Sequence, residues 1–194
     1  MSGVRALTRE EVMRCASLFA GRYALRNRAL FLLQYYTGRR ISQLLALRIG
    51  DVVTENGEMV EDIYFKRRDV KGKLQGESVD FHPDARGPVA DWLEHARELG
   101  YFLRHEKLFP AAGGRRLTRH AVFEIYDNAF RKAGLHGRLG THSLRKAFGQ
   151  RMHPELKFDV NKTARALGQT SLSWTQRYLD EAKDEIRAAG RKVL

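Results

Sequence analysis

The sequence predicts a mainly helical fold with one small antiparallel β-sheet, of the α+β class. Apolar residues recur at helical spacing along most of the chain, whereas residues 51–83 contain β-branched and aromatic runs broken by glycines. We find no repeat, linker or low-complexity segment that would divide the chain. Its 194 residues and 43% hydrophobic content suit one main domain, which we assign to residues 1–180, followed by a short tail at 181–194.

The N-terminal part of the chain predicts three helices in succession. Thr8 and Glu11 match the S/T-x-x-E capping box, which opens a helix that continues to about residue 20. Residues 22–37 carry apolar groups at helical spacing, and Gly38 is typical of the position just after a helix end. A short helix is expected in the stretch ISQLLALR that follows.

The β-rich stretch is expected to form two or three antiparallel strands. The Asn56-Gly57 pair and the glycines at 72 and 76 interrupt its apolar runs, and such residues supply the positive φ angles that hairpin turns require. Lys71 and Lys73 would then lie at the tip of a hairpin.

The remainder of the chain predicts further helices, separated by glycines and capping residues. They are expected at 84–99 with Pro88 in the first turn or at a break, at about 118–134, at 142–152 with Thr141 as cap, at a segment capped by Asp159 or Asn161 and ending at Gly168, and at 172–180. The charged tail at 181–194 is also expected to be helical.

The composition favours a polyanionic partner. Lys and Arg number 35 against 23 Asp and Glu, and Arg, whose planar fork binds phosphate in two places, outnumbers Lys by 25 to 10. Nucleic acid is therefore the leading partner, ahead of an anionic membrane surface, because no strongly amphipathic basic anchor stands out. The sequence contains no apolar run near the ~18 residues that span a bilayer and no signal-peptide pattern. Cys15, the only cysteine, is expected in the core, which fits a cytoplasmic setting.

Five residues of four types, in four separate stretches, form a set that could transfer a phosphoryl group without a metal. The tyrosine hydroxyl can attack a phosphodiester, and arginines can bind the non-bridging oxygens and stabilise the charge of the transition state. A lysine on a loop can protonate the leaving oxygen, while a histidine accepts the proton of the nucleophile. The residues are Arg40, Lys71 or Lys73, His142, Arg145 and Tyr178.

These stretches resemble the catalytic domain of the tyrosine recombinase (phage integrase) family. TGRRISQLLALRIGDV resembles the first arginine box, THSLRKAFG the His-x-x-Arg box, and LGQTSLSWTQRYL the box that ends in the nucleophile. Each motif alone is weak, but together and in this order they cover about residues 8–182. The resemblance implies a fold like that of type IB topoisomerases, cleavage of DNA through a 3′-phosphotyrosyl intermediate, and no cofactor or ATP.

The resemblance also implies a role for each matching residue. Arg40 and Arg145 match the phosphate-clamping arginines, His142 matches the histidine of the second box, and Tyr178 matches the nucleophile. Lys71 is preferred to Lys73 as the general acid, although the loop does not fix the register. The family also acts as a tetramer on two DNA sites, which implies that the tail docks on a neighbouring protomer and that the protein works at the nucleoid, as in mobile genetic elements.

Several features depart from the family pattern. Gln169 stands where histidine or tryptophan is usual; it can donate a hydrogen bond to a phosphate but cannot carry a proton. Gln43 replaces a usual acidic residue, and Arg39 a usual apolar one. The family's N-terminal DNA-binding domain has no counterpart, so we expect either an excised catalytic domain or a short single-domain recombinase.

Other interpretations remain open at this point. The chain could be a catalytically weak or inactive DNA-binding regulator of the same fold, as Gln43 and Gln169 would allow, or a type IB topoisomerase. The arginines of the 115–119 stretch could contact the DNA backbone or form a solvated face. Those arginines are Arg115, Arg116 and Arg119, whereas His120 and His153 are expected to be structural, and Phe148 and Trp174 to belong to the core.

Overall fold

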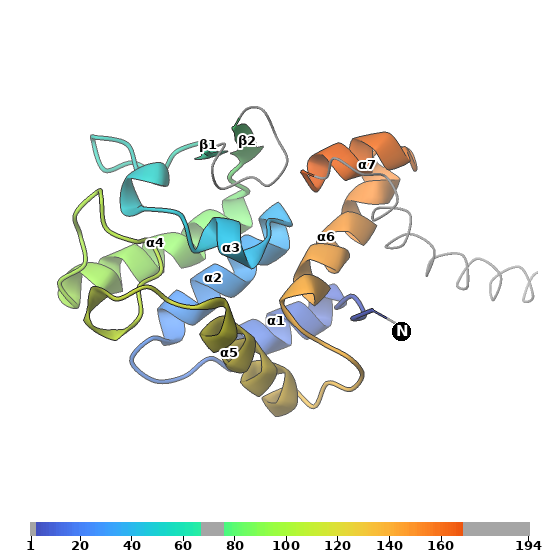
Figure 1. Cartoon of the computed structure of the whole chain (residues 1–194), viewed down its shortest axis with the longest axis horizontal. Coiled ribbons are helices and arrows are strands. Elements are labelled where there is room, and N and C mark those ends of the chain that lie inside the picture. Colours follow the sequence, from blue (N-terminus) through green and yellow to red (C-terminus); the bar gives the residue numbers. More distant parts are fainter. Residues whose placement is uncertain (1–2, 67–75, 169–194) are drawn as a thin grey trace, which may run out of the picture.

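In the computed structural model, which describes residues 3–66 and 76–168, helices pack around a central helix and a small hairpin lies at one side (Figure 1). The central helix α2 contacts α1, α3, α4 and α6, with α4 and α6 on opposite sides of it. The mainly helical class with a small antiparallel sheet is confirmed. The helices are α1 (Arg9–Ser17), α2 (Ala24–Thr37), α3 (Ile41–Leu44), α4 (Pro83–Glu98), α5 (Arg119–Lys132), α6 (Thr141–Glu155) and α7 (Val160–Ala166), with short 3-10 turns η1 (Ile49–Asp51) and η3 (Ala112–Gly114).

Two sequence signals in the N-terminal part mark the start of α1 and the end of α2. The Thr8 hydroxyl accepts the backbone N–H of Glu11 at 3.2 Å, and the Glu11 carboxylate accepts that of Thr8 at 3.0 Å, so the capping box is formed. Helix α1 is shorter than expected and ends at Ser17. Helix α2 ends at Gly38, whose φ of 62° is the left-handed conformation that favours glycine.

The sheet consists of β1 (Asp62–Phe65) and β2 (Glu77–Asp80), paired antiparallel with Phe65 opposite Glu77. Ile63 and Phe65 point into the core, whereas Tyr64 between them is exposed, as the period of two requires. The Asn56-Gly57 pair does not join these strands. It lies in a separate loop that is closed by a bridge between Val53 and Met59.

Three helix boundaries from α4 onwards differ from their expectation. Pro83 is the first residue of α4, so Pro88 lies inside the helix, where it removes one backbone donor without ending the helix. Thr141 is the first helical residue of α6 rather than its cap, because the cap is Gly140, whose N–H donates to the Ser143 hydroxyl at 3.2 Å. Helix α6 also continues to Glu155.

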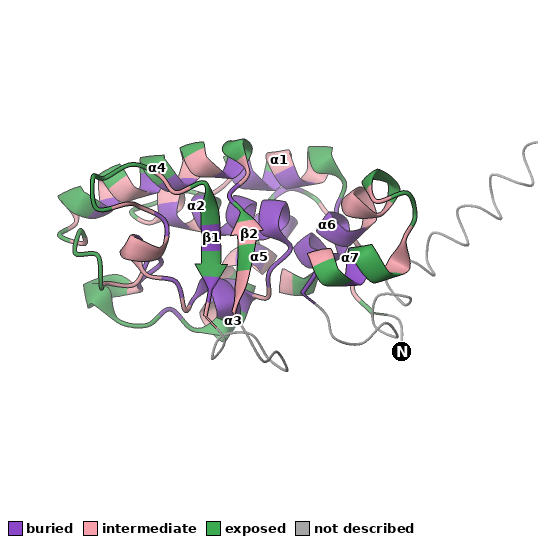
Figure 2. Ribbon diagram, turned by 90° about the horizontal axis from the view of Figure 1, so that it is seen from above, coloured by how far each residue is buried: buried purple, intermediate pink, exposed green. Residues whose placement is uncertain are grey.

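Figure 2 shows the buried residues gathered along α2 and on the inner sides of the helices around it. Phe31 of α2 makes edge-to-face contacts with Tyr126 of α5 and Phe19, with ring centroids 4.9 and 5.5 Å apart. Cys15 is fully buried, as expected, and burial raises the pKa of its thiol to about 11. In the described part of the chain, no helix combines the length and apolar character needed to cross a membrane.

Candidate functional site

The first component of the site is the guanidinium of Arg145, which lies almost completely inside the protein. Arg145 is 1% exposed and sits on α6, and its Nη1 donates to the backbone carbonyl of Gly38 at 2.6 Å. This hydrogen bond joins the His-x-x-Arg stretch directly to the turn between α2 and α3. A buried, charged side chain with a fixed hydrogen-bond partner can adopt few rotamers, so its orientation is set before any ligand binds.

Arg40 is placed by the same turn. It precedes α3, and its backbone N–H donates to the Oε1 of Gln43 at 2.9 Å. Gln43 is 2% exposed and therefore supports Arg40 from inside the protein. From the sequence alone, Gln43 was noted only as a departure from the family pattern. Arg40 itself is half-buried, so a ligand at the surface can still reach it.

His142 lies on the first turn of α6 and is exposed at the protein surface. Its pKa is lowered from the usual 6.5, first because nearby protein atoms desolvate the ring, and then because Arg145 and Arg40 repel its charged form. Both arginines therefore lie close enough to act on the same imidazole. A ring that is neutral near pH 7 can accept a proton, while two guanidinium groups beside it attract an anion.

A close approach of backbone and ring holds the two stretches together. A Cβ atom on Gly38 would lie 2.3 Å from Cδ1 of Phe148, one turn along α6 from Arg145, so only glycine fits there. Phe148 is 7% exposed, which confirms its expected place in the core. Gly38 thus supplies a left-handed turn, a carbonyl acceptor and a contact surface at one position.

Arg39, next to Arg40, is a buried residue with two fixed partners. From the sequence alone it was noted only as a departure from the family pattern. It is 2% exposed, and its Nη1 lies 2.8 Å from the Oε2 of Glu77 on β2. Its Nη2 donates to the carbonyl of Ala166 at the end of α7, at 3.2 Å. The only signal in the sequence was an arginine in a position that is expected to be apolar.

The other expected site residues stand differently. Lys71, Lys73, Gln169 and Tyr178 lie outside the described residues, as do Trp174, the segment 172–180 and the tail at 181–194. The arginines at 115, 116 and 119 are exposed, and their expected contact with DNA stays a prediction.

The two histidines that were expected to be structural also have partners. The Nδ1 of His153 lies 2.9 Å from the hydroxyl of Thr163, which links α6 to α7 and fits a structural role. The Nε2 of His120 lies 3.5 Å from the carboxylate of Glu124 on the exposed face of α5.

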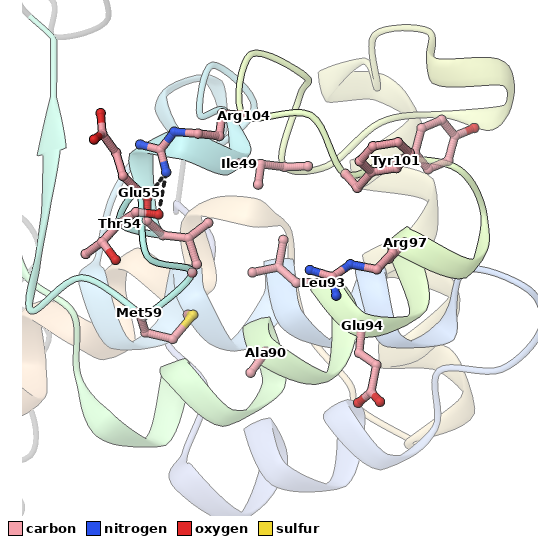
Figure 3. A pocket seen from close by; sticks show the side chains of 13 residues that line it. Ile49, Thr54, Glu55, Met59, Ala90, Leu93, Glu94, Arg97, Tyr101 and Arg104 are labelled. Atoms are coloured by element: carbon pink, nitrogen blue, oxygen red, sulfur yellow. Dashed lines mark hydrogen bonds between the residues drawn. The ribbon is translucent and has the colours of Figure 1, made fainter.

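A pocket of about 460 Å³ lies elsewhere, between the 49–59 segment and α4 (Figure 3). Ile49, Met59 and Leu93 give it an apolar lining, and Arg104 at its edge donates to the carbonyl of Val53 at 2.8 Å. None of Arg40, His142 and Arg145 lines this pocket. The described residues also contain no cluster of three or more His, Cys, Asp or Glu side chains that could hold a metal ion.

Comparison with known proteins shows which proteins this chain is similar to. The chain is 30% identical over 167 residues to the tyrosine recombinase XerD of Corynebacterium glutamicum. The aligned region covers 86% of this chain and 52% of that protein. The chain thus spans about half the length of the curated relatives that it matches.

Solved structures of recombinases and integrases share the fold. The XerH site-specific recombinase bound to its palindromic difH substrate has a TM-score of 0.75 at 23% identity, with 96% of this chain and 52% of that chain covered. A lambda integrase tetramer bound to a Holliday junction has a TM-score of 0.64 at 17% identity, with 92% and 49% covered. The model of the phage integrase family matches residues 5–185, and since this is nearly the whole chain, the protein belongs to the phage integrase family.

Proposed function

We propose that this chain cleaves and rejoins DNA at specific sites through a 3′-phosphotyrosyl intermediate. The observation that carries the proposal is the convergence of Arg40, Arg145 and His142 around the Gly38 turn, with both arginines acting on the imidazole. Two fixed guanidinium groups beside a neutral imidazole suit a phosphodiester whose charge increases in the transition state. Membership in the phage integrase family supports the same activity.

The proposed reaction is a transesterification in which Tyr178 supplies the nucleophile. Its phenolic oxygen forms a bond to phosphorus, the bond from phosphorus to the 5′ oxygen breaks, and His142 takes the phenolic proton. Lys71, or Lys73 in its place, gives a proton to the 5′ oxygen, which leaves as a hydroxyl. Arg40, Arg145 and Gln169 bind the non-bridging oxygens throughout. Because the phosphotyrosyl bond retains the energy of the broken bond, the reverse reaction rejoins the strand without ATP.

The proposed partners are double-stranded DNA and further copies of the chain. The XerH structure is a complex with its DNA substrate, and the lambda integrase structure is a tetramer on a Holliday junction, which supports the same arrangement here. In this arrangement residues 1–180 carry the chemistry and the tail at 181–194 docks on a neighbouring protomer. Such a protein would act on DNA in the cytoplasm, at the nucleoid.

A nicked suicide substrate tests the chemistry directly, because loss of the short fragment beyond the cleavage site traps the covalent intermediate. We expect wild type, on DNA that flanks the gene, to form an adduct that migrates slowly on a denaturing gel, and Tyr178→Phe to form none. Tyr126→Phe is the matched control. Tyr126 is fully buried and its hydroxyl has no hydrogen-bond partner among the described residues, so its removal leaves adduct formation intact.

Absence of an adduct from every flanking sequence, together with salt-dependent DNA binding, would contradict the proposal. That result would favour a DNA-binding regulator of the same fold. An adduct that persists in Tyr178→Phe would instead assign the nucleophile to another residue.

A further inference from the structure

We propose that Arg39 is a positioning residue that holds the base of the β1–β2 hairpin and the end of α7 in fixed relation to Arg40. The inference rests on the proposed function, because it concerns the segments that carry the general acid and the nucleophile. Arg39 itself lies inside the protein. It is 2% exposed, while the next residue, Arg40, remains reachable at the surface.

The first contact of Arg39 fixes the hairpin at the point where its loop departs. Nη1 pairs with the Oε2 of Glu77 at 2.8 Å, and the guanidinium carbon lies 5.7 Å from the ring centroid of Phe65. Phe65 and Glu77 are opposite each other in the register, and they form the last pair of the ladder. The chain between them contains Lys71 and Lys73. Arg39 therefore grips both strands at the base of the segment that carries the candidate general acid.

The second contact fixes the end of α7. Nη2 donates to the carbonyl of Ala166 at 3.2 Å, which satisfies one of the carbonyls that a helix leaves unpaired in its last turn. Gly168 then passes so close that a Cβ atom would lie 2.2 Å from Nη1 of Arg39 and 2.9 Å from Oε2 of Glu77. The chain continues from Gly168 through Gln169 to Tyr178. The same guanidinium thus packs against the start of the segment that carries the nucleophile.

Stability alone does not account for this arrangement. A buried ion pair is weak support for stability, since apolar side chains of similar volume often serve as well or better. What the pair does provide is direction, because the planar fork of arginine sends one nitrogen to Glu77 and the other to Ala166. Lysine could keep the ion pair but has no second fixed branch. The geometry therefore joins the hairpin, α7 and the Arg40 turn at one residue.

The test separates a positioning role of Arg39 from a role in stability by removing the charges of Arg39 and Glu77 together. Arg39→Leu alone removes the guanidinium that pairs with Glu77 and is expected to lower the melting temperature, whereas Arg39→Leu with Glu77→Gln removes both charges of this pair. For the double variant we expect a near-normal melting temperature and a DNA affinity within about twofold of wild type. Its single-turnover rate of adduct formation should fall at least about tenfold, because a small misplacement of reacting groups costs one to two orders of magnitude. Arg39→Lys should give an intermediate rate.

Arg26→Leu is the matched control for loss of a buried arginine. Arg26 is 4% exposed and donates to the carbonyl of Pro110 at 2.6 Å, away from the hairpin and α7. The Arg26→Leu variant should have a lower melting temperature, but its rate of adduct formation should be unchanged at a temperature where it is folded. If the double variant forms adduct at the wild-type rate, the inference about Arg39 is overturned while the proposed function stands. A wild type that forms no adduct would overturn the proposed function and the inference with it.

Discussion

At the scale of single residues, the site combines groups that differ in how far the protein surrounds them. Arg145 is 1% exposed and fixed to the Gly38 carbonyl, Arg40 is half-buried, and His142 is exposed. Of these two side-chain types, only the imidazole of histidine changes its charge in the ordinary pH range of a protein. Among these three described residues, His142 is therefore the one through which pH can act.

DNA binding should take up a proton at His142. In the free protein the pKa of His142 lies below 6.5, because of desolvation and because Arg145 and Arg40 repel the charged ring. A bound phosphate offsets that repulsion and attracts the imidazolium, so the pKa rises in the complex. The complex then binds more protons than the free protein, and affinity increases as pH falls from the higher pKa of the complex towards the lower pKa of the free protein.

Fluorescence anisotropy of a labelled duplex, titrated between about pH 8 and about pH 5.5, measures this effect across the range in which histidine titrates. His142→Asn keeps a polar side chain but cannot titrate, so the difference between the two proteins isolates this ring from the other histidines. Identical pH dependence in wild type and variant would show that no phosphate reaches His142.

At the scale of elements, the contact between the Gly38 turn and α6 carries the site. Gly38→Ala is expected to lower the free energy of unfolding by about 3 kcal/mol, because it adds a left-handed strain of roughly 1–2 kcal/mol to the cost of overpacking against Phe148. The new Cβ would lie 2.3 Å from the Phe148 ring, at a φ of 62°. Urea denaturation measures the loss.

Gly57→Ala provides the comparison for that variant. Gly57 has a φ of +84°, yet a Cβ atom there would meet nothing within 4 Å, so it should lose only the roughly 1–2 kcal/mol of backbone strain. Equal losses in the two variants would mean that Phe148 moves aside without cost and that the turn is not locked to α6.

Local signals explain which elements could be predicted from the sequence. The Thr8–Glu11 box, Gly38 and the Asp159 cap each act within a few residues, and each marks a real boundary. The start of α6 differs from the prediction by one residue. Thr141 was expected to be the cap, but the cap is Gly140, and its backbone N–H donates to the hydroxyl of Ser143 inside the helix.

Long-range pairing sets the limit for the site. Arg40, His142 and Arg145 were brought together by their resemblance to a known set of motifs, since no local rule joins residues so far apart. The Arg39–Glu77 pair, 38 positions apart, depends on the register of the hairpin and on how α7 packs, and neither can be read from local pattern.

At the scale of the whole molecule, the positive charge exceeds what the site itself uses. The formal net charge is +12 at pH 7, whereas only two arginines and one histidine converge at the described part of the site. Other arginines and lysines of the sequence contribute the rest of this charge. They suit a partner that presents many phosphates over a long surface rather than a single anion.

This excess charge predicts a steep salt dependence of DNA binding. If about 6 phosphates are neutralised, the slope of log affinity against log salt concentration should be about −5, because each contact releases condensed counterions. Replacing Arg115, Arg116 and Arg119 together by glutamine should make the slope shallower by about 3 if each one contacts a phosphate. Arg131→Gln is the control, since Arg131 is exposed but pairs with Asp127 at 3.1 Å on α5. A triple variant with the wild-type slope would identify the 115–119 arginines as a solvated face, and a slope near zero in the wild type would exclude a polyanionic partner.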